Sequence, residues 1–273
     1  MFHSIVRRRF LVWMATFWVA MVSFGLARVS VGDEPAKKAV DDSREAIDRI
    51  AKGYEFFLGA DSVPLKMEAE PVLRWPNATR ETQEGATYIW TLDGRPEAIG
   101  CVWEVGGRWH HEFHSLSSSK LVAKHNRRTI WQPEKVGVEF SRFAEAPDPA
   151  ESAVKRLAQM KDLARRFKCR LNSGDGKSEE LRVLPQPLYR YKTERKDVVD
   201  GALFAFVQGT DPEVVVVLEA ALRDGKSKWR YALTRSTAFA VEADLDGETV
   251  WSEPFSVGAR NAAWFTGSLG SLD

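Results

Sequence analysis

The feature that most constrains the fold of this chain is a repeat within it. The segment PVLRW begins at residue 71 and aligns with PLYRY, which begins at residue 187, so the offset is 187 − 71 = 116. The longer segment EGATYIWTLDGRPE (84–97) aligns with DGALFAFVQGTDPE (200–213) at the same offset and without a gap. Self-similarity at a constant spacing predicts that the chain is an internal duplication.

The repeat continues beyond these segments with a small insertion. Trp109 and Trp131 align with Trp229 and Trp251 at an offset of 229 − 109 = 120. The added residues fall near LRDGKSK (222–228), which has the polar, glycine-containing composition of a loop. An insertion is tolerated best in a loop, and the four tryptophans are expected to pack on the sheets of both halves.

Each half has the pattern of one helix followed by short strands. Apolar residues recur at helical spacing over 42–58 and over 148–167. Asp148, Pro149 and Glu151 mark the start of the second helix, and Gly59 marks the end of the first. The segments that follow are rich in β-branched and aromatic residues and are separated by turn signals such as Asp93-Gly94, Gly106-Gly107, Asp224-Gly225 and Asp246-Gly247.

These patterns predict an α+β fold made of two homologous halves, residues 33–147 and 148–253. Each half is predicted to be one helix followed by an antiparallel sheet of about five strands. The sequence leaves open whether the two sheets join edge to edge or pack face to face. Residues 254–273 are predicted to be an irregular tail that docks through Trp264 and Phe265.

The first 32 residues are predicted to be a signal peptide or an N-terminal membrane anchor. Arg7, Arg8 and Arg9 precede an uncharged stretch over 10–27, and small residues at 30–32 offer a cleavage site. The run RRRFL also fits a twin-arginine signal, so the export route stays open. With either route, we expect the remainder of the chain in the periplasm or outside the cell.

Charge and motifs exclude several classes of function. Removing residues 1–32 takes away four arginines and no acid, so the net charge falls from +1 to 1 − 4 = −3. A slightly acidic body argues against a nucleic-acid partner, which would require a clustered basic face. The sequence contains no phosphate-binding loop, no dinucleotide fingerprint and no GxSxG nucleophile motif.

The two cysteines leave two alternatives open. Cys101 and Cys169 have neither CxxC spacing nor the spacing of metal ligands. In an oxidising compartment they could form one disulfide bond; otherwise they are two separate buried thiols.

Several segments resemble those of one protein family. The runs GRPEAIG, HEFHSL, RLAQMKDLARRF, LPQPLYRY and DGALFAFVQGTDPEVVVVLEA are similar to those of an uncharacterised family of exported proteins from planctomycete bacteria. The resemblance covers most of the chain after residue 32. It implies a bacterial exported protein and assigns no functional residue.

The repeat separates residues that serve the shared fold from residues that occur in one half only. Arg74 and Glu97 recur as Arg190 and Glu213, so we expect each pair to be a structural ion pair. The stretch WHHEFHS (109–115), by contrast, aligns with WRYALTR (229–235), and its histidines and glutamate are not repeated.

The repeat also predicts the orientation of side chains in the histidine stretch. The alternation in 229–235 predicts a strand in which Trp109, His111 and Phe113 face the core. The other face then carries His110, Glu112 and His114, which we interpret as a polar, solvated surface. The alternative is a zinc or other transition-metal site in which His125 joins two of these three residues, because all three are too far apart along a strand to bind one ion.

The sequence therefore leaves two hypotheses for function. The preferred one is a non-catalytic binding or interaction module of the cell envelope, with no cofactor, an unknown ligand, and the groove between the halves as its contact surface. Membrane contact is expected only through residues 10–27 if they are retained. The alternative is a metal-dependent hydrolase that uses His110, Glu112, His114 and His125.

Overall fold

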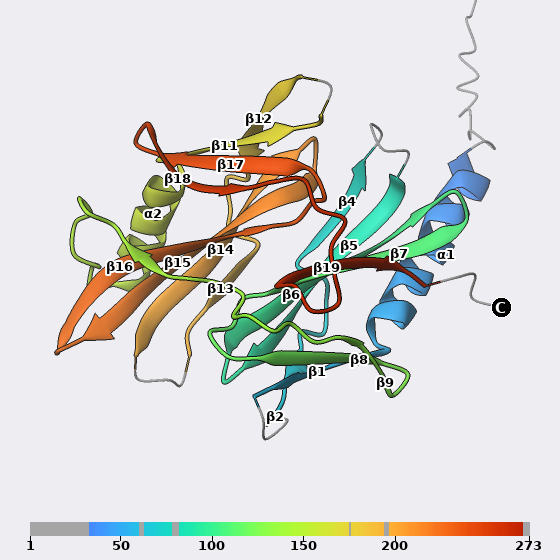
Figure 1. Cartoon of the computed structure of the whole chain (residues 1–273), viewed down its shortest axis with the longest axis horizontal. Helices are drawn as coiled ribbons and strands as arrows, with labels where there is room; N and C mark the ends of the chain where they lie inside the picture. The colour runs from blue at the N-terminus through green and yellow to red at the C-terminus, as the bar shows by residue number, and fades with distance from the viewer. Residues whose placement is uncertain (1–32, 60–62, 78–81, 175, 194–196, 270–273) are drawn as a thin grey trace, which may run out of the picture.

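The structure is a computed structural model that describes residues 33–59, 63–77, 82–174, 176–193 and 197–269. This part of the chain holds two α-helices and 19 strands, so the fold is α+β and mostly β (Figure 1). All strand pairs are antiparallel, as predicted. Neither described helix is long and apolar enough to cross a membrane. The predicted signal segment, residues 1–32, lies outside the described residues.

The first set of elements forms a helix and two sheets. Helix α1 (Asp33–Ala51) comes first. A four-stranded sheet has the order β2-β1-β8-β9, and a six-stranded sheet has the order β19-β7-β6-β5-β3, with β4 also on β5. The strands of this set are β1 (Tyr54–Leu58), β2 (Val63–Pro64), β3 (Lys66–Met67), β4 (Leu73–Asn77), β5 (Thr82–Leu92), β6 (Arg95–Val105), β7 (Arg108–Ser115), β8 (Leu121–His125) and β9 (Arg128–Trp131).

The second set forms a helix and one nine-stranded sheet. Helix α2 (Ala153–Ala164) precedes it, and the sheet order is β10-β16-β15-β14-β12-β11-β17-β18, with β13 also on β14. The strands are β11 (Phe167–Asn172), β12 (Ser178–Val183), β13 (Tyr189–Tyr191), β14 (Val198–Gln208), β15 (Asp211–Arg223), β16 (Lys226–Arg235), β17 (Ala240–Leu245) and β18 (Glu248–Glu253), together with β10 (Ser141–Arg142).

Equivalent strands of the two sets pair with the same register. In the first set Trp90 lies opposite Ala98, and in the second Phe206 lies opposite Val214, so both partners differ by 116. Each of these ladders has a bulge directly after that pair. The next ladder also has the same register. Ala98 lies opposite Ser115 in the first set, and Val214 lies opposite Arg235 in the second. These partners are related by the two offsets of the sequence repeat, 98 + 116 = 214 and 115 + 120 = 235.

Two strands cross between the sets. Strand β10 follows the first set in sequence but pairs with β16 of the second. Strand β19 (Trp264–Ser268) follows the second set but pairs with β7 of the first. Trp264 and Phe265 are buried there, as predicted. The prediction of an irregular tail is wrong for 264–268, because this segment satisfies the otherwise open hydrogen-bonding edge of β7.

The turns form where the sequence predicts them, but both helices are shorter at their C-terminal ends than predicted. Asp93, Asp224 and Asp246 and the glycine after each have positive φ angles, the conformation of tight hairpin turns. Helix α1 ends at Ala51, and the predicted helical residues 54–58 form β1. Their alternation of buried Tyr54 and Phe56 with more exposed residues suits a strand. Ser152, rather than Asp148, caps α2, and its side chain accepts a hydrogen bond from the backbone of Lys155.

The two large sheets pack face to face, which settles the arrangement that the sequence left open. Each helix lies over the outer face of its own sheet and buries a separate core. A third core lies between the sheets, where Ile89 and Ile99 of the first set meet Leu203, Val215 and Val217 of the second. The face of each sheet that points away from its helix is therefore covered by the other sheet.

Candidate functional site

The histidine stretch is strand β7, and its side chains alternate as predicted. Phe113 belongs to the core beneath α1, and His111 is buried on the same side. Glu112 and His114 point the other way, toward the second sheet, and their exposed fractions are 7% and 0%. The prediction of a solvated face is therefore wrong for these two residues, because the second sheet covers that face.

His111 is a core histidine with a hydrogen-bond partner. Its Nδ1 atom lies 2.6 Å from the hydroxyl of Tyr54. Burial lowers the pKa of His111 to about 3, and the charges of His125, His110 and Arg260 act in the same direction. The ring is therefore neutral at physiological pH and packs with Tyr54 and Phe113.

Glu112 and His114 contact the second sheet. Ser236 donates a hydrogen bond to Glu112 over 2.9 Å, and His114 Nδ1 lies 3.2 Å from the hydroxyl of Thr234. Burial, with a contribution from Arg235, holds the pKa of His114 well below its usual range. These contacts join β7 to the C-terminal end of β16 and the residue that follows it.

The four residues of the predicted metal site are not brought together. His110 stacks on Trp103, with ring centroids 5.6 Å apart. His125 packs against Tyr54, on the side of β7 opposite to Glu112 and His114. Among the residues that the structure describes, no group of three or more His, Cys, Asp or Glu side chains is placed to hold a metal ion.

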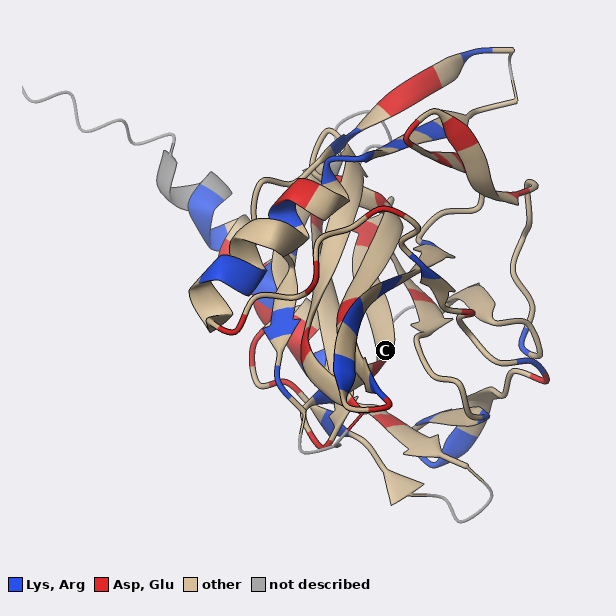
Figure 2. Cartoon of the chain, turned by 90° about the vertical axis from the view of Figure 1, so that its left-hand side faces the viewer, with Lys and Arg blue, Asp and Glu red and all other residues tan. Residues whose placement is uncertain are grey.

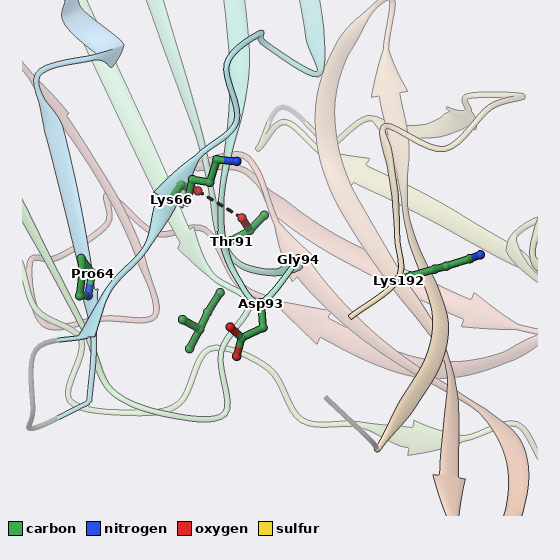
Figure 3. Close-up of a pocket in the computed structure, with 7 residues that line it drawn as sticks. Pro64, Lys66, Thr91, Asp93, Gly94 and Lys192 are labelled. Atoms are coloured by element: carbon green, nitrogen blue, oxygen red, sulfur yellow. Dashed lines mark hydrogen bonds between the residues drawn. The ribbon is translucent and has the colours of Figure 1, made fainter. Parts of the chain in front are cut away.

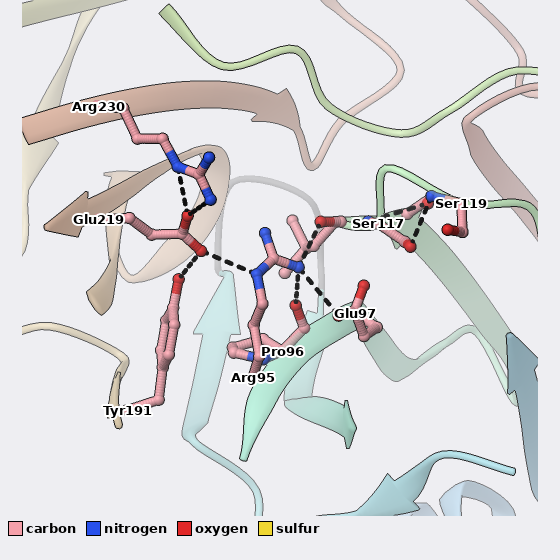
Figure 4. A network of polar contacts seen from close by, with 10 residues as sticks. Arg95, Pro96, Glu97, Ser117, Ser119, Tyr191, Glu219 and Arg230 are labelled. Carbon is pink, nitrogen blue, oxygen red and sulfur yellow. Dashed lines mark hydrogen bonds and ion pairs between the residues drawn. The ribbon is translucent and has the colours of Figure 1, made fainter. Parts of the chain in front are cut away.

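A buried charged network that the sequence did not suggest also links the two sheets (Figure 4). Glu219 of β15 is fully buried and accepts hydrogen bonds from Arg95 over 2.9 Å, from Tyr191 over 2.7 Å and from Arg230 over 2.7 Å. Arg95 also lies 3.1 Å from Glu97. The only available signal was the acidic residue within the apolar run VVVVLEAAL (214–222).

The network fixes the protonation states of Arg95 and Tyr191. Burial acts to lower the pKa of Arg95, but Glu219 and Glu97 outweigh it, so the pKa lies above its usual value. Burial and the charge of Glu219 raise the pKa of Tyr191 well above its usual value. The guanidinium group stays charged and the phenol stays neutral, which suits an ion pair that binds the sheets together.

The predicted pairs of Arg74 with Glu97 and Arg190 with Glu213 are wrong. Arg74 donates to Asp48 of α1 over 2.7 and 2.8 Å, and Arg190 donates to the fully buried Asp200 over 2.7 and 3.1 Å. In the strand pairing Arg74 lies opposite Ala86, so its side chain is on the face that the helix covers. Glu97 is next to Ala98, which also lies on that face, so the side chain of Glu97 points to the opposite face. Glu97 and Glu213 therefore lie on the faces between the sheets, where the arginines do not reach.

The two cysteines are free and buried, so of the two alternatives that the sequence left open the structure has the two separate thiols. Cys169 lies in the core under α2, whereas Cys101 lies on the inner face of the first sheet within 3.3 Å of the hydroxyl of Thr87. A sheet separates these two environments. Burial raises the pKa of both thiols.

A hollow of about 320 Å³ lies at the rim where the two sets meet. The turn Asp93-Gly94 and the residues before it form one wall, with Pro64 and Lys66, and Lys192 comes from the second set (Figure 3). The carboxylate of Asp93 lies at this hollow, whereas the ammonium group of Lys192 points away from it. Its lining mixes apolar residues such as Pro64 and Leu92 with polar ones such as Thr91 and Asp93, and the hollow is open to solvent.

Comparison with known proteins gives no relative. No family model, no curated protein and no solved structure matches this chain.

Proposed function

We propose that the chain after residue 32 is an exported, non-catalytic binding or interaction module of the cell envelope. The observation that carries this proposal is that three ionisable side chains of β7 are buried in contacts that hold the fold together. Glu112 and His114 are buried in contacts between the two sheets, and His111 is a neutral core residue. The chemistry that suggested an enzyme is thus explained by the packing of the fold.

Internal duplication is part of the proposal, and the pairing register supports it. Contacts between the sets also occur at equivalent positions: His114 meets Thr234, and 234 − 114 = 120. Thr210 donates to the carbonyl of Pro76 over 2.8 Å, while Gly94 lies against the carbonyl of Lys192. Since 210 − 94 = 116 and 192 − 76 = 116, the two contacts are exchanged by one approximate two-fold axis.

The contact surfaces are proposed at the rim between the sets and on strand edges left open. The hollow beside Asp93 is one such surface. On the side of the molecule that faces the viewer in Figure 2, basic and acidic residues are interspersed. A mixed distribution of charge agrees with a partner other than nucleic acid. The resemblance to planctomycete exported proteins and the apolar segment 10–27 support an envelope location.

Saturable binding to the envelope tests this function. The fluorescently labelled chain from residue 33 is mixed with the envelope fraction of its native cells and sedimented. We expect the bound amount to saturate and the unlabelled protein to displace it. A bound amount that rises linearly and is not displaced would contradict the proposal. The same protein heated until it is unfolded is the control for adhesion of exposed apolar surface.

A further inference from the structure

Strand β18 is an edge of the nine-stranded sheet, and its outer side has no partner among the described residues. The backbone N–H of Ser256 donates to the carbonyl of Ala238, and Val241 pairs with Glu253, so the ladder with β17 runs to residue 256. Hydrogen-bonded residues alternate in an antiparallel ladder. Ser256 therefore directs its backbone toward β17, and Trp251, Glu253 and Phe255 direct theirs outward.

The equivalent edge of the first set is covered. After β9, the backbone N–H groups of Gln132 and Glu134 donate to the carbonyls of Arg260 and Asn261 over 2.7 and 2.9 Å. Trp131 is fully buried there, and its indole donates to Ala262 over 2.8 Å. Trp251, at the equivalent position of β18, is only partly buried. One edge is thus covered by the turn at 259–262, and the other is open.

Exposed apolar side chains continue the open edge. Phe255 is 62% exposed and Val257 is 74% exposed, and both alternate with Ser256 along the same extended segment. Val250 of β18 is also exposed. Outward backbone groups beside exposed apolar side chains are what an added strand requires: the backbone supplies affinity and alternate side chains supply specificity.

The charge of this edge identifies the chemistry of its occupant. The hairpin β17–β18 (240–253) contains five acidic residues and no lysine or arginine. Arg170 pairs with Glu242 and Asp244, and Arg166 pairs with Asp246. Glu248 and Glu253 lie at the two ends of β18. Glu253 forms a long ion pair of 3.9 Å with Arg235, and 44% of its side chain stays exposed to a partner.

A second copy of the chain is a poor occupant. Antiparallel pairing of β18 with itself over its full length, Glu248–Glu253, would place Glu248 opposite Glu253 of the other copy, and like charges opposite each other destabilise a strand pair. A segment that carries lysine or arginine on the face next to these glutamates would instead place basic groups against both of them.

We propose that the outer edge of β18 and the segment 254–257 bind an extended, basic segment of a partner protein by strand addition. This inference rests on the proposed binding function and names the kind of partner. The two glutamates select basic residues, and Phe255 and Val257, which follow Glu253 on the same face, contact apolar side chains that lie on the same face of the partner strand as its basic residues.

The test uses a short fluorescent peptide that carries first valine and then lysine at every second position, with threonine between them, so that in antiparallel order one face meets Phe255 and then Glu253. Fluorescence polarisation is the measurement. Glu253→Pro removes one outward N–H without removing a hydrogen bond to β17, a position where edge strands accept proline. We expect this variant to raise the Kd at least about tenfold, or about 1.4 kcal/mol. Glu253→Gln keeps the N–H and removes the charge, so it should raise the Kd only about two- to fivefold, as for an exposed charge pair.

A second measurement leaves the protein unchanged. The same peptide, N-methylated on alternate backbone amides, keeps its charges but cannot form the strand ladder. We expect it to bind at least about tenfold more weakly. Equal binding of both peptides would show a charged surface only, and equal binding by the protein and Glu253→Pro would show that β18 is not the binding edge; either result would overturn the proposal.

Two further outcomes would also overturn it. A dimer of the wild-type chain that Glu253→Pro dissociates in analytical ultracentrifugation would make a second copy the occupant. If Glu253→Pro leaves binding to the envelope unchanged, β18 is not the docking strand, and the proposed binding function still stands.

Discussion

Removing Glu219 should destabilise the protein more than almost any other single change, because three donors depend on it. Its carboxylate is fully buried and accepts from Arg95, Tyr191 and Arg230. In Glu219→Ala, Arg95 keeps Glu97 and the carbonyls of Pro96 and Leu116, but its Nε loses its acceptor. Breaking a buried pair by removing one partner costs about 3–5 kcal/mol, so we expect a loss in that range.

Urea unfolding followed by tryptophan fluorescence measures this loss. Glu248→Ala, an exposed glutamate on β18, is the matched control and should change the unfolding free energy by less than about 0.5 kcal/mol. A loss below about 1 kcal/mol for Glu219→Ala would refute the view that this network holds the sheets together.

Three further predictions concern the buried groups. The pKa of His111 is lowered to about 3 in the folded protein, so below about pH 6.5 its ring takes up a proton in the unfolded chain but not in the folded one. The free energy of unfolding should therefore fall by up to about 1.4 kcal/mol for each pH unit below that point. Urea midpoints at pH 7.5 and pH 5 measure this, and His111→Gln should have the smaller difference; an equal difference would contradict the assignment. Cys101 and Cys169 should react with a thiol reagent only after unfolding without reductant, and an unreactive unfolded chain would indicate a disulfide bond. Phe265→Ala should cost about 3–5 kcal/mol in urea unfolding if β19 is part of the core, and a loss below about 1 kcal/mol would show that it only rests on the surface.

Much of the fold can be predicted from local patterns of the sequence. Asp-Gly pairs need positive φ angles, so the hairpin turns at Asp93, Asp224 and Asp246 could be predicted from residue type. The alternation in β16 placed Trp229 and Tyr231 on one face, and both lie in the core under α2. Such features depend on a few neighbouring residues.

Features that depend on distant segments could not be predicted in the same way. Alternation shows that Glu112 and His114 share a face, but it does not show whether solvent or another sheet covers that face. The same limit explains the wrong ion pairs, because Arg74 and Arg190 have other acids within reach, Asp48 and Asp200. The end of α1 was ambiguous for a local reason: Tyr54 fits both the helical spacing from Ile47 and Ile50 and the strand spacing to Phe56.

The metal content of the purified chain from residue 33, prepared without a histidine tag, tests the central claim most directly. The protein is incubated with zinc, nickel, copper or iron, dialysed and measured by plasma mass spectrometry. The account predicts metal well below one ion per chain, with no difference between the wild type and the variant His110→Ala, His114→Ala. About one ion per chain that is lost in this variant would contradict it and make the strand WHHEFHS a metal site.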